Sequence, residues 1–229
     1  MNDEKMRILR MLENGKISAD EAVRLLEALS KEKDGIGFVD RIVHAFSFEG
    51  TKIGKIREEF KADKVLINVN ASSLTLKESS DSVFRVYGDG RFSLNEEGEK
   101  TKVGIFGSMT VDVPANSSLH INLKAGDLNG ILDVPLKLES KMSNTELYVK
   151  EPLDIDANVR MGSLTLSFSH PVNMSFNIVN SLGSISQNLG LNESDEGVKG
   201  VVGKDEGLVK IDAKLSSIEL KKKKESDEI

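Results

Sequence analysis

Two carboxylates two residues apart are the first candidate for chemistry in this sequence. Asp154 and Asp156 alternate with apolar residues in LDIDANV, and side chains two apart on a strand lie on the same face. Such a pair is a weak candidate polar site, because two carboxylates can share acid–base work or supply calcium ligands. The same pattern is typical of the solvent-exposed face of a sheet, and the sequence favours that interpretation.

The other candidate sites fail on residue type or spacing. His44, His120 and His170 lie in separate segments, and none has a second ligand at the helical spacing of metal sites. The stretch NESDEG at 192–197 lacks the alternating ligands and terminal Glu of a calcium loop. The stretch GVKGVVGKD at 197–205 lacks the first glycine of a phosphate loop. We therefore predict no catalytic residues, no metal and no cofactor, and hence no enzyme.

Composition narrows the class of protein. The chain has 229 residues, a net charge of −6 and no cysteine, which argues against a nucleic-acid footprint and excludes disulfides and thiolate metal sites. The first ten residues, MNDEKMRILR, lack the apolar core of a signal peptide, and no run is long enough for a transmembrane helix. We expect a cytoplasmic protein, with non-standard export to the surface as the alternative. The basic run at 221–224 allows weak peripheral membrane contact.

A helical hairpin is predicted over residues 1–33. Asn14-Gly15 ends the first helix, and Ser18 with Glu21 forms a capping box for the second. Two helices this short are marginal alone, so their apolar stripe must pack on the rest of the chain, on a second copy or on a partner protein. The candidate partner or assembly surface comprises Met6, Leu9, Leu12, Ile17, Val23, Leu26 and Leu29.

A connecting segment, partly helical, is expected over 34–62. Residues 36–48 place apolar side chains at helical spacing, whereas EGTKIGKIREEF at 49–60 fits either a linker or a strand. From residue 63 to 229 the pattern changes to short alternating runs, which predicts a repetitive β-domain.

The repeats have two fixed marks. Pro114, Pro135, Pro152 and Pro171 recur at intervals of 21, 17 and 19 residues. Between them, each segment has two alternating runs that meet at a small residue: Gly126, Ser143, Gly162 or Gly183. The predicted inward side chains are Ile121, Leu123, Leu128, Leu138, Leu147, Val149, Ile155, Leu164, Leu166, Phe176, Ile178, Ile185, Ile211, Ile218 and Leu220.

This pattern predicts a mainly β fold, a right-handed β-solenoid or β-roll of short repeats in which successive coils stack in chain order. An antiparallel sandwich is the alternative. The helical segments are expected to cover the first coil. The acidic, glycine-rich insertion at 190–207 is expected to be a surface loop or hairpin, and the charged tail at 221–229 is expected to protect the opposite end.

The hairpin MRILRMLENGKISADEAVRLLEAL resembles a short N-terminal helical domain of many bacterial proteins. The segments SKMSNTELYVK and ANVRMGSLTLSF resemble repeats of the putative-adhesin family that follows it in those proteins. The resemblance covers roughly residues 1–33 and 65–221. It implies a non-enzymatic, right-handed β-solenoid, and some family members are linked to cell-envelope stress.

Three functions follow as expectations. The first is a scaffold or binding protein in envelope-stress regulation, with the hairpin for self-association or docking of a protein partner and the β-domain as the binding surface. The second is a surface adhesin-like binder of glycan, peptide or lipid. The third is a polysaccharide-processing enzyme of parallel β-helix architecture, for which only Asp154 and Asp156 hint at an acidic cluster.

Overall fold

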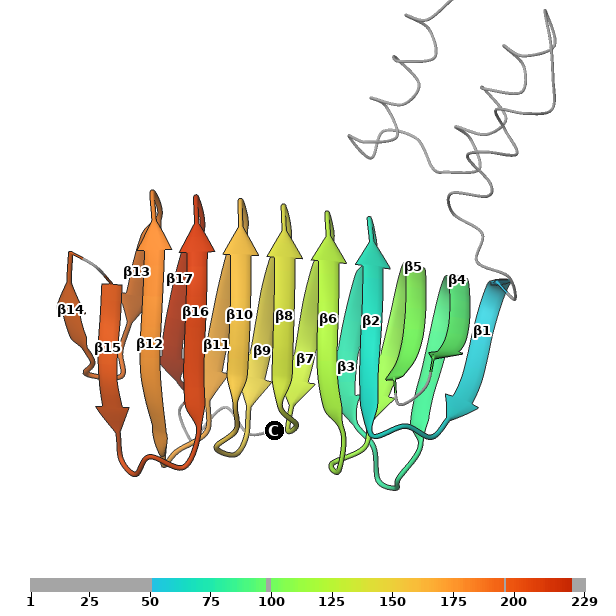
Figure 1. The fold of residues 1–229 in the computed structure, drawn as a ribbon, viewed down its shortest axis with the longest axis horizontal. Coiled ribbons are helices and arrows are strands. Elements are labelled where there is room, and N and C mark those ends of the chain that lie inside the picture. Colours follow the sequence, from blue (N-terminus) through green and yellow to red (C-terminus); the bar gives the residue numbers. More distant parts are fainter. Residues whose placement is uncertain (1–50, 98–99, 196, 224–229) are drawn as a thin grey trace, which may run out of the picture. The chain divides into compact units, whose positions relative to one another are not determined.

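The computed structural model describes residues 51–97, 100–195 and 197–223. The described strands form one mixed sheet of 17 strands, and these residues contain no helix (Figure 1). The prediction of a mainly β fold is thereby confirmed. The predicted hairpin at 1–33 and the predicted helix at 36–48 lie outside the described residues.

Six parallel strands form what we call the first ladder, and each is hydrogen-bonded to the next. In spatial order they are β2 (Lys64–Asn70), β6 (Ser118–Lys124), β8 (Leu136–Lys141), β10 (Ile155–Arg160), β16 (Leu208–Lys214) and β12 (Met174–Ser181).

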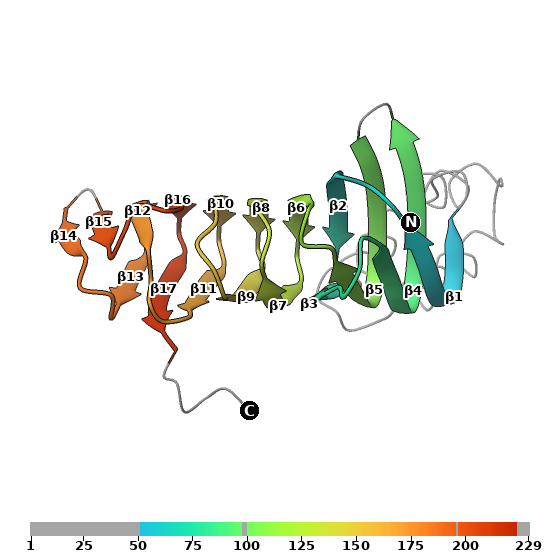
Figure 2. The same cartoon turned by 90° about the horizontal axis from the view of Figure 1, so that it is seen from below.

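The second ladder repeats this order with the strand that follows each of these in the chain. Its members are β3 (Ser73–Glu78), β7 (Asp127–Leu132), β9 (Asn144–Val149), β11 (Ser163–Phe168), β17 (Ser217–Lys222) and β13 (Ser184–Gln187). Figure 2 shows the two ladders as two facing rows of strands.

Five further strands extend the sheet at its two ends; all their pairings are antiparallel except those of the strand that covers β2 and β3. At one end, β5 (Lys100–Val113) pairs with both β2 and β3, then β4 (Phe84–Glu97) pairs with β5, and β1 (Lys52–Phe60) pairs with β4. At the other end, β15 (Gly197–Val202) pairs with β12, and β14 (Asn192–Ser194) pairs with β15. Short or charged outer strands limit edge-to-edge pairing with other chains.

The long strands β4 and β5 must bend to follow both ladders. Gly90 and Gly107 face each other at the bend, with φ angles of 151° and 116°. A Cβ on Gly107 would lie 2.4 Å from the backbone oxygen of Asp89, so a larger residue cannot fit. The Gly107 amide donates to Ser72 Oγ at 2.9 Å, which ties the bend to the point where β2 gives way to β3.

The core lies between the two ladders. Inward side chains in register stack into columns, and one column consists of Ile67, Ile121, Leu138, Ala157, Ile211 and Ile178. Every predicted inward residue is buried except Ile185, which is partly buried against the core. Burial of apolar area at about 25 cal/mol per Å² lets such columns stabilise the fold.

The predicted turn residues mark one corner of the structure. Gly126, Ser143, Gly162 and Gly183 each lie where a first-ladder strand passes into its second-ladder strand, and we call this place the first corner. The four prolines lie at the opposite corner, just before or between strands such as β7 and β8. Regular turns at both corners explain why strand pairs recur at intervals near 19 residues.

Stacking in chain order is wrong in two places. The pair β16 and β17 lies between β10–β11 and β12–β13, although it comes last in the sequence. At the other end, β5 covers the pair β2–β3 on its outer side. Parallel strands with the same alternating pattern are interchangeable as neighbours, so their pattern does not encode their order.

The structure bears on three boundary predictions. Lys221 and Lys222 belong to β17 rather than to a tail, so they protect no end of the sheet. That end is formed by β14 and β15, which are a hairpin within the 190–207 insertion. In the connecting segment, residues 52–60 are strand β1, one of the two alternatives that the sequence left open.

Candidate ligand-binding face

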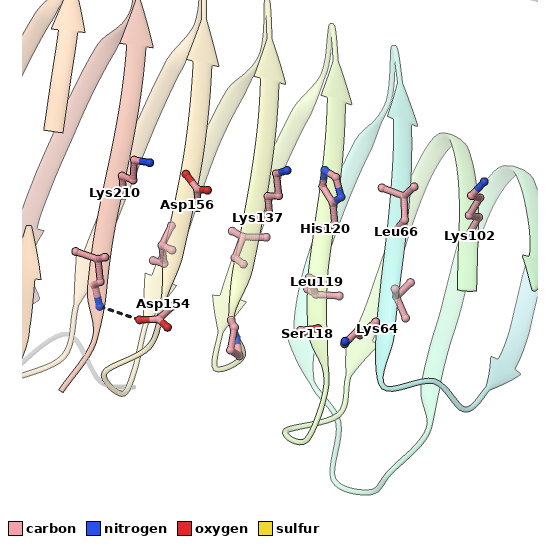
Figure 3. Close-up of a pocket in the computed structure, with 15 residues that line it drawn as sticks. Lys64, Leu66, Lys102, Ser118, Leu119, His120, Lys137, Asp154, Asp156 and Lys210 are labelled. Carbon is pink, nitrogen blue, oxygen red and sulfur yellow. Dashed lines mark hydrogen bonds between the residues drawn. The ribbon is translucent and has the colours of Figure 1, made fainter. Parts of the chain in front are cut away.

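The outward side chains of the first ladder form aligned rows because parallel strands share one register. Figure 3 shows the central row, in which each residue faces its neighbour on the next strand. In order, the row contains Lys102, Leu66, His120, Lys137, Asp156 and Lys210. One local rule, alternation, thus brings together charges that are more than 100 residues apart in the sequence.

An open groove of about 760 Å³ runs over this row. Its charged lining comprises four lysines and two aspartates: Lys64, Lys102, Lys137, Lys210, Asp154 and Asp156. The groove therefore carries an excess of positive charge, although the whole chain has a net charge of −6. Apolar Leu66 and Pro135 lie between the charged groups, and the buried Leu119 lies beneath them.

The predicted pair Asp154 and Asp156 does lie on one face, and both side chains are exposed. Asp154 Oδ1 accepts a hydrogen bond from the Leu208 amide at 3.0 Å, which fixes the start of β16. Asp156 lies in register between Lys137 and Lys210. The structure thus gives Asp154 a structural contact and places Asp156 in the lysine row, with no third carboxylate in the groove lining.

His120 occupies the middle of the groove. Its Nε2 is buried and lies 3.4 Å from Glu139 Oε1, without a hydrogen bond to any described residue. Lys137 Nζ lies 3.8 Å from the same Glu139 oxygen. His170 lies in the segment between β11 and β12, and His44 lies outside the described residues.

A second groove of about 540 Å³ continues along the same face. It shares Lys137 and Asp156 with the first groove and adds Lys124, Lys141 and Arg160. The first groove crosses the strands and the second extends it along β6, β8 and β10, so the face can accommodate an extended ligand. Among the described residues, neither groove contains a group of three acidic or histidine side chains that could hold a metal ion.

The groups with shifted pKa values lie elsewhere. A hydrogen bond from Arg85 lowers the pKa of Asp81 to about 2. Burial raises the pKa of Asp133, and a hydrogen bond to Glu78 raises the pKa of Lys150. Asp133, Glu78 and Lys150 lie at or next to the ends of second-ladder strands, not in the grooves.

Sequence reasoning missed the lysines. Lys64, Lys137 and Lys210 sit in three different repeats and look like ordinary outward positions one at a time. A register alignment of all repeats would have revealed Lys137 beside His120, but Lys210 joins the row only because β16 is inserted next to β10.

The predicted assembly residues Met6, Leu9, Leu12, Ile17, Val23, Leu26 and Leu29 lie outside the described residues. Within the part of the chain that the structure describes, we find no helix with the length and apolar character needed to cross a membrane.

Comparison with known proteins gives two likenesses. Residues 3–34 match the SHOCT-like domain, and no curated protein matches the chain. The fold is similar to the crystal structure of a putative cell adhesion protein from Clostridium sporogenes, with a TM-score of 0.51 and 11% identity. That match covers 74% of this chain and all of the other chain. At this identity the likeness shows a shared fold alone.

Proposed function

We propose that this chain is a non-enzymatic binding protein whose first-ladder face holds an extended, negatively charged ligand such as an acidic polysaccharide. The lysine row in the open groove carries the proposal, because it concentrates positive charge on one face of an acidic chain. Lys64 and Lys210 form no ion pair with a described residue, so their charges are available to a ligand. Apolar side chains between the cations offer contact with sugar rings or alkyl groups.

The scaffold part of the proposal combines the fold with the sequence. The two ladders joined by regular corners support the predicted right-handed β-solenoid as a description of residues 63–222, even though the coils do not follow chain order. The match of residues 3–34 to the SHOCT-like domain supports a hairpin that mediates assembly or docks a protein partner. The link to envelope-stress regulation rests on the sequence resemblance. A pull-down with and without residues 1–33 tests the role of the hairpin.

Binding to a defined polymer tests the groove. We expect the full chain to bind polygalacturonate, an acidic polysaccharide, and to ignore neutral dextran. K137Q/K210Q should weaken that binding about tenfold at low salt, since each removed cation loses one charge-assisted contact. The matched control K77Q/K221Q removes two lysines from the second-ladder face and should leave binding unchanged. Equal binding of both polymers, or an equal loss in the control, would contradict the proposal.

Location separates this proposal from the adhesin-like alternative. We propose a cytoplasmic protein, and the alternative requires the chain at the cell surface. Cell fractionation with protease protection measures this directly, because surface-exposed protein is degraded in intact cells.

A further inference from the structure

Large apolar side chains line the first corner on four neighbouring strand pairs. Each first-ladder strand ends just before a residue in the left-handed region, with φ between 47° and 61°. In the spatial order of the strands, these residues are Ala71, Ala125, Met142, Met161, Leu215 and Leu182. The last four form what we call the apolar ridge, and their exposed fractions are 54%, 45%, 51% and 76%.

The ridge residues are true neighbours. The Met142 amide donates to Arg160 O at 2.9 Å, and the Met161 amide donates to Lys214 O at 3.0 Å. The Leu215 amide donates to Ser181 O at 2.9 Å. These bonds continue the ladder into the corner, so adjacent ridge residues are spaced by about one strand separation of 4.8 Å. The ridge lies at the arrowhead ends of β8, β10, β16 and β12 in Figure 1.

Met and Leu are unfavourable at the ridge positions, both for their backbone conformation and for their exposure to solvent. The left-handed region is disfavoured for residues with a Cβ, and Gly or Asn adopts it most readily. At the same positions, exposed Met and Leu side chains lose the benefit of burial. An outlier of backbone conformation that also exposes an apolar side chain points to function, and here it recurs on four adjacent strands.

A row of cations borders the ridge. The residue before each corner is Lys124 on β6, Lys141 on β8, Arg160 on β10 and Lys214 on β16. All four are exposed and stand in register. None of them forms an ion pair with a residue that the structure describes; Arg160 Nε donates only to Asn158 Oδ1, at 3.1 Å.

We infer that the apolar ridge and the cation row bind the surface of a bilayer that contains anionic lipids. The methionine and leucine tips enter the interface while the cations meet lipid phosphates, the combination that gives peripheral membrane binding. A projecting corner suits a deformable lipid surface, which needs no matching groove. A second copy fits less well, because ridge-to-ridge packing would bring two cation rows together. The apolar ridge lies outside both grooves, whereas Lys124, Lys141 and Arg160 of the cation row also line the second groove.

Vesicle co-sedimentation of the full chain tests the apolar part. We expect binding to vesicles of phosphatidylcholine and phosphatidylglycerol in equal parts, and little binding to phosphatidylcholine alone. M161N/L215N should weaken binding about tenfold or more and should leave the unfolding temperature unchanged or raised, because Asn tolerates the left-handed region. The control I53N/V201N changes two exposed apolar residues on outer strands, 72% and 57% exposed, and should bind as the wild type does.

Two triple variants, one in the cation row and one control, test the role of the positive charges. K141Q/R160Q/K214Q should lower partitioning roughly 100-fold at low salt. K55Q/R57Q/K199Q removes the same number and type of exposed charges from β1 and β15 and should change it less than about twofold.

Three results would overturn the inference. They are no binding of the wild type to anionic vesicles, unchanged binding by both ridge and charge variants, and equal losses in the controls. A lower oligomeric mass of M161N/L215N would assign the ridge to a second copy instead. If that variant does not fold, M142N/L182N makes the same test at the ends of the ridge.

Discussion

The two outward faces share one backbone plan but use it differently. On the second-ladder face, polar side chains bond to one another across strands: Thr75 Oγ1 donates to Asn129 at 3.0 Å, Asn144 Nδ2 to Asp127 at 3.2 Å, and Ser163 Oγ to Asn144 at 3.0 Å. On the first-ladder face, Asn122 Nδ2 donates to Asn68 Oδ1 at 3.0 Å, but the central row carries three lysines and Asp156 beside an open groove.

This difference between the two faces indicates that one stabilises the fold and the other is available for binding. Hydroxyl and amide side chains that satisfy each other hold neighbouring strands in register and gain little from a ligand. Lysines beside a groove contribute little to folding, because exposed charges interact weakly in water. The second-ladder face therefore stabilises the stack, and the first-ladder face is left for binding.

The first corner joins the two faces, so its disruption should have the largest effect. A Cβ at Gly162 would lie 2.1 Å from the Ser143 backbone oxygen, which stacks directly above it. We expect Gly162→Ala to lower the free energy of unfolding by about 3 kcal/mol, as measured by urea denaturation. Ser143→Ala, at the same corner, removes the hydrogen bonds of one hydroxyl to Lys141 O at 2.8 Å and Leu123 O at 3.4 Å and should cost about 1 kcal/mol. Equal stability of both variants would mean that the corner does not couple the faces.

The next largest loss of unfolding free energy is expected for an asparagine on the second-ladder face. Asn144 bridges two strands by donating to Asp127 and accepting from Ser163, so Asn144→Ala should cost about 1–2 kcal/mol of unfolding free energy. On the first-ladder face, Asn158 accepts only from Arg160 two residues away, and Asn158→Ala should cost about 0.5 kcal/mol or less. If the two losses measured by denaturation are the same, the division between the faces is wrong.

The smallest effect concerns pH at the second-ladder ends. Burial raises the pKa of Asp133, with nearby Glu78 adding to the shift. The folded state then binds the proton more tightly than the unfolded chain, whose Asp has a pKa of about 3.9. This contribution is present at low pH and is lost as the pH rises through the folded pKa.

Asp133→Asn should therefore raise the unfolding temperature at pH 7 and leave it unchanged at pH 3. Solvent screening of the half-buried carboxyl keeps the rise to about 1 °C. Thermal unfolding at the two pH values measures it, and a lower unfolding temperature at pH 7 would contradict the assignment.

Local pattern predicted the inside of the fold well, since alternation along each strand decides which side chains face the core. It also located the first corner, because Gly162 and Ser143 mark the same turn in neighbouring repeats. Neighbour order depends instead on pairing between equivalent strands, which alternation does not encode. The bent strands β4 and β5 were not predicted because they match no repeat. Gly90 and Gly107 indicate a bend only when the pairing of the two strands is known.

The candidate site shows the same limit. Alternation placed Asp154 and Asp156 on one face, as predicted. The lysines around Asp156 come from neighbouring strands, and one of those neighbours, β16, follows more than 50 residues later. Their charges become a site only through register between strands.

The place of β16 and β17 has a consequence during protein synthesis. These strands bond to β10 and β11 on one side and to β12 and β13 on the other. As the ribosome releases the chain, residues 174–187 must wait for residues 208–222 before they find their parallel partners, although β12 can pair earlier with the antiparallel strand β15. The strands that are synthesised last are thus inserted between strands that are synthesised earlier. A nascent chain that stops before residue 208 would leave two pairs of strand edges open to aggregation.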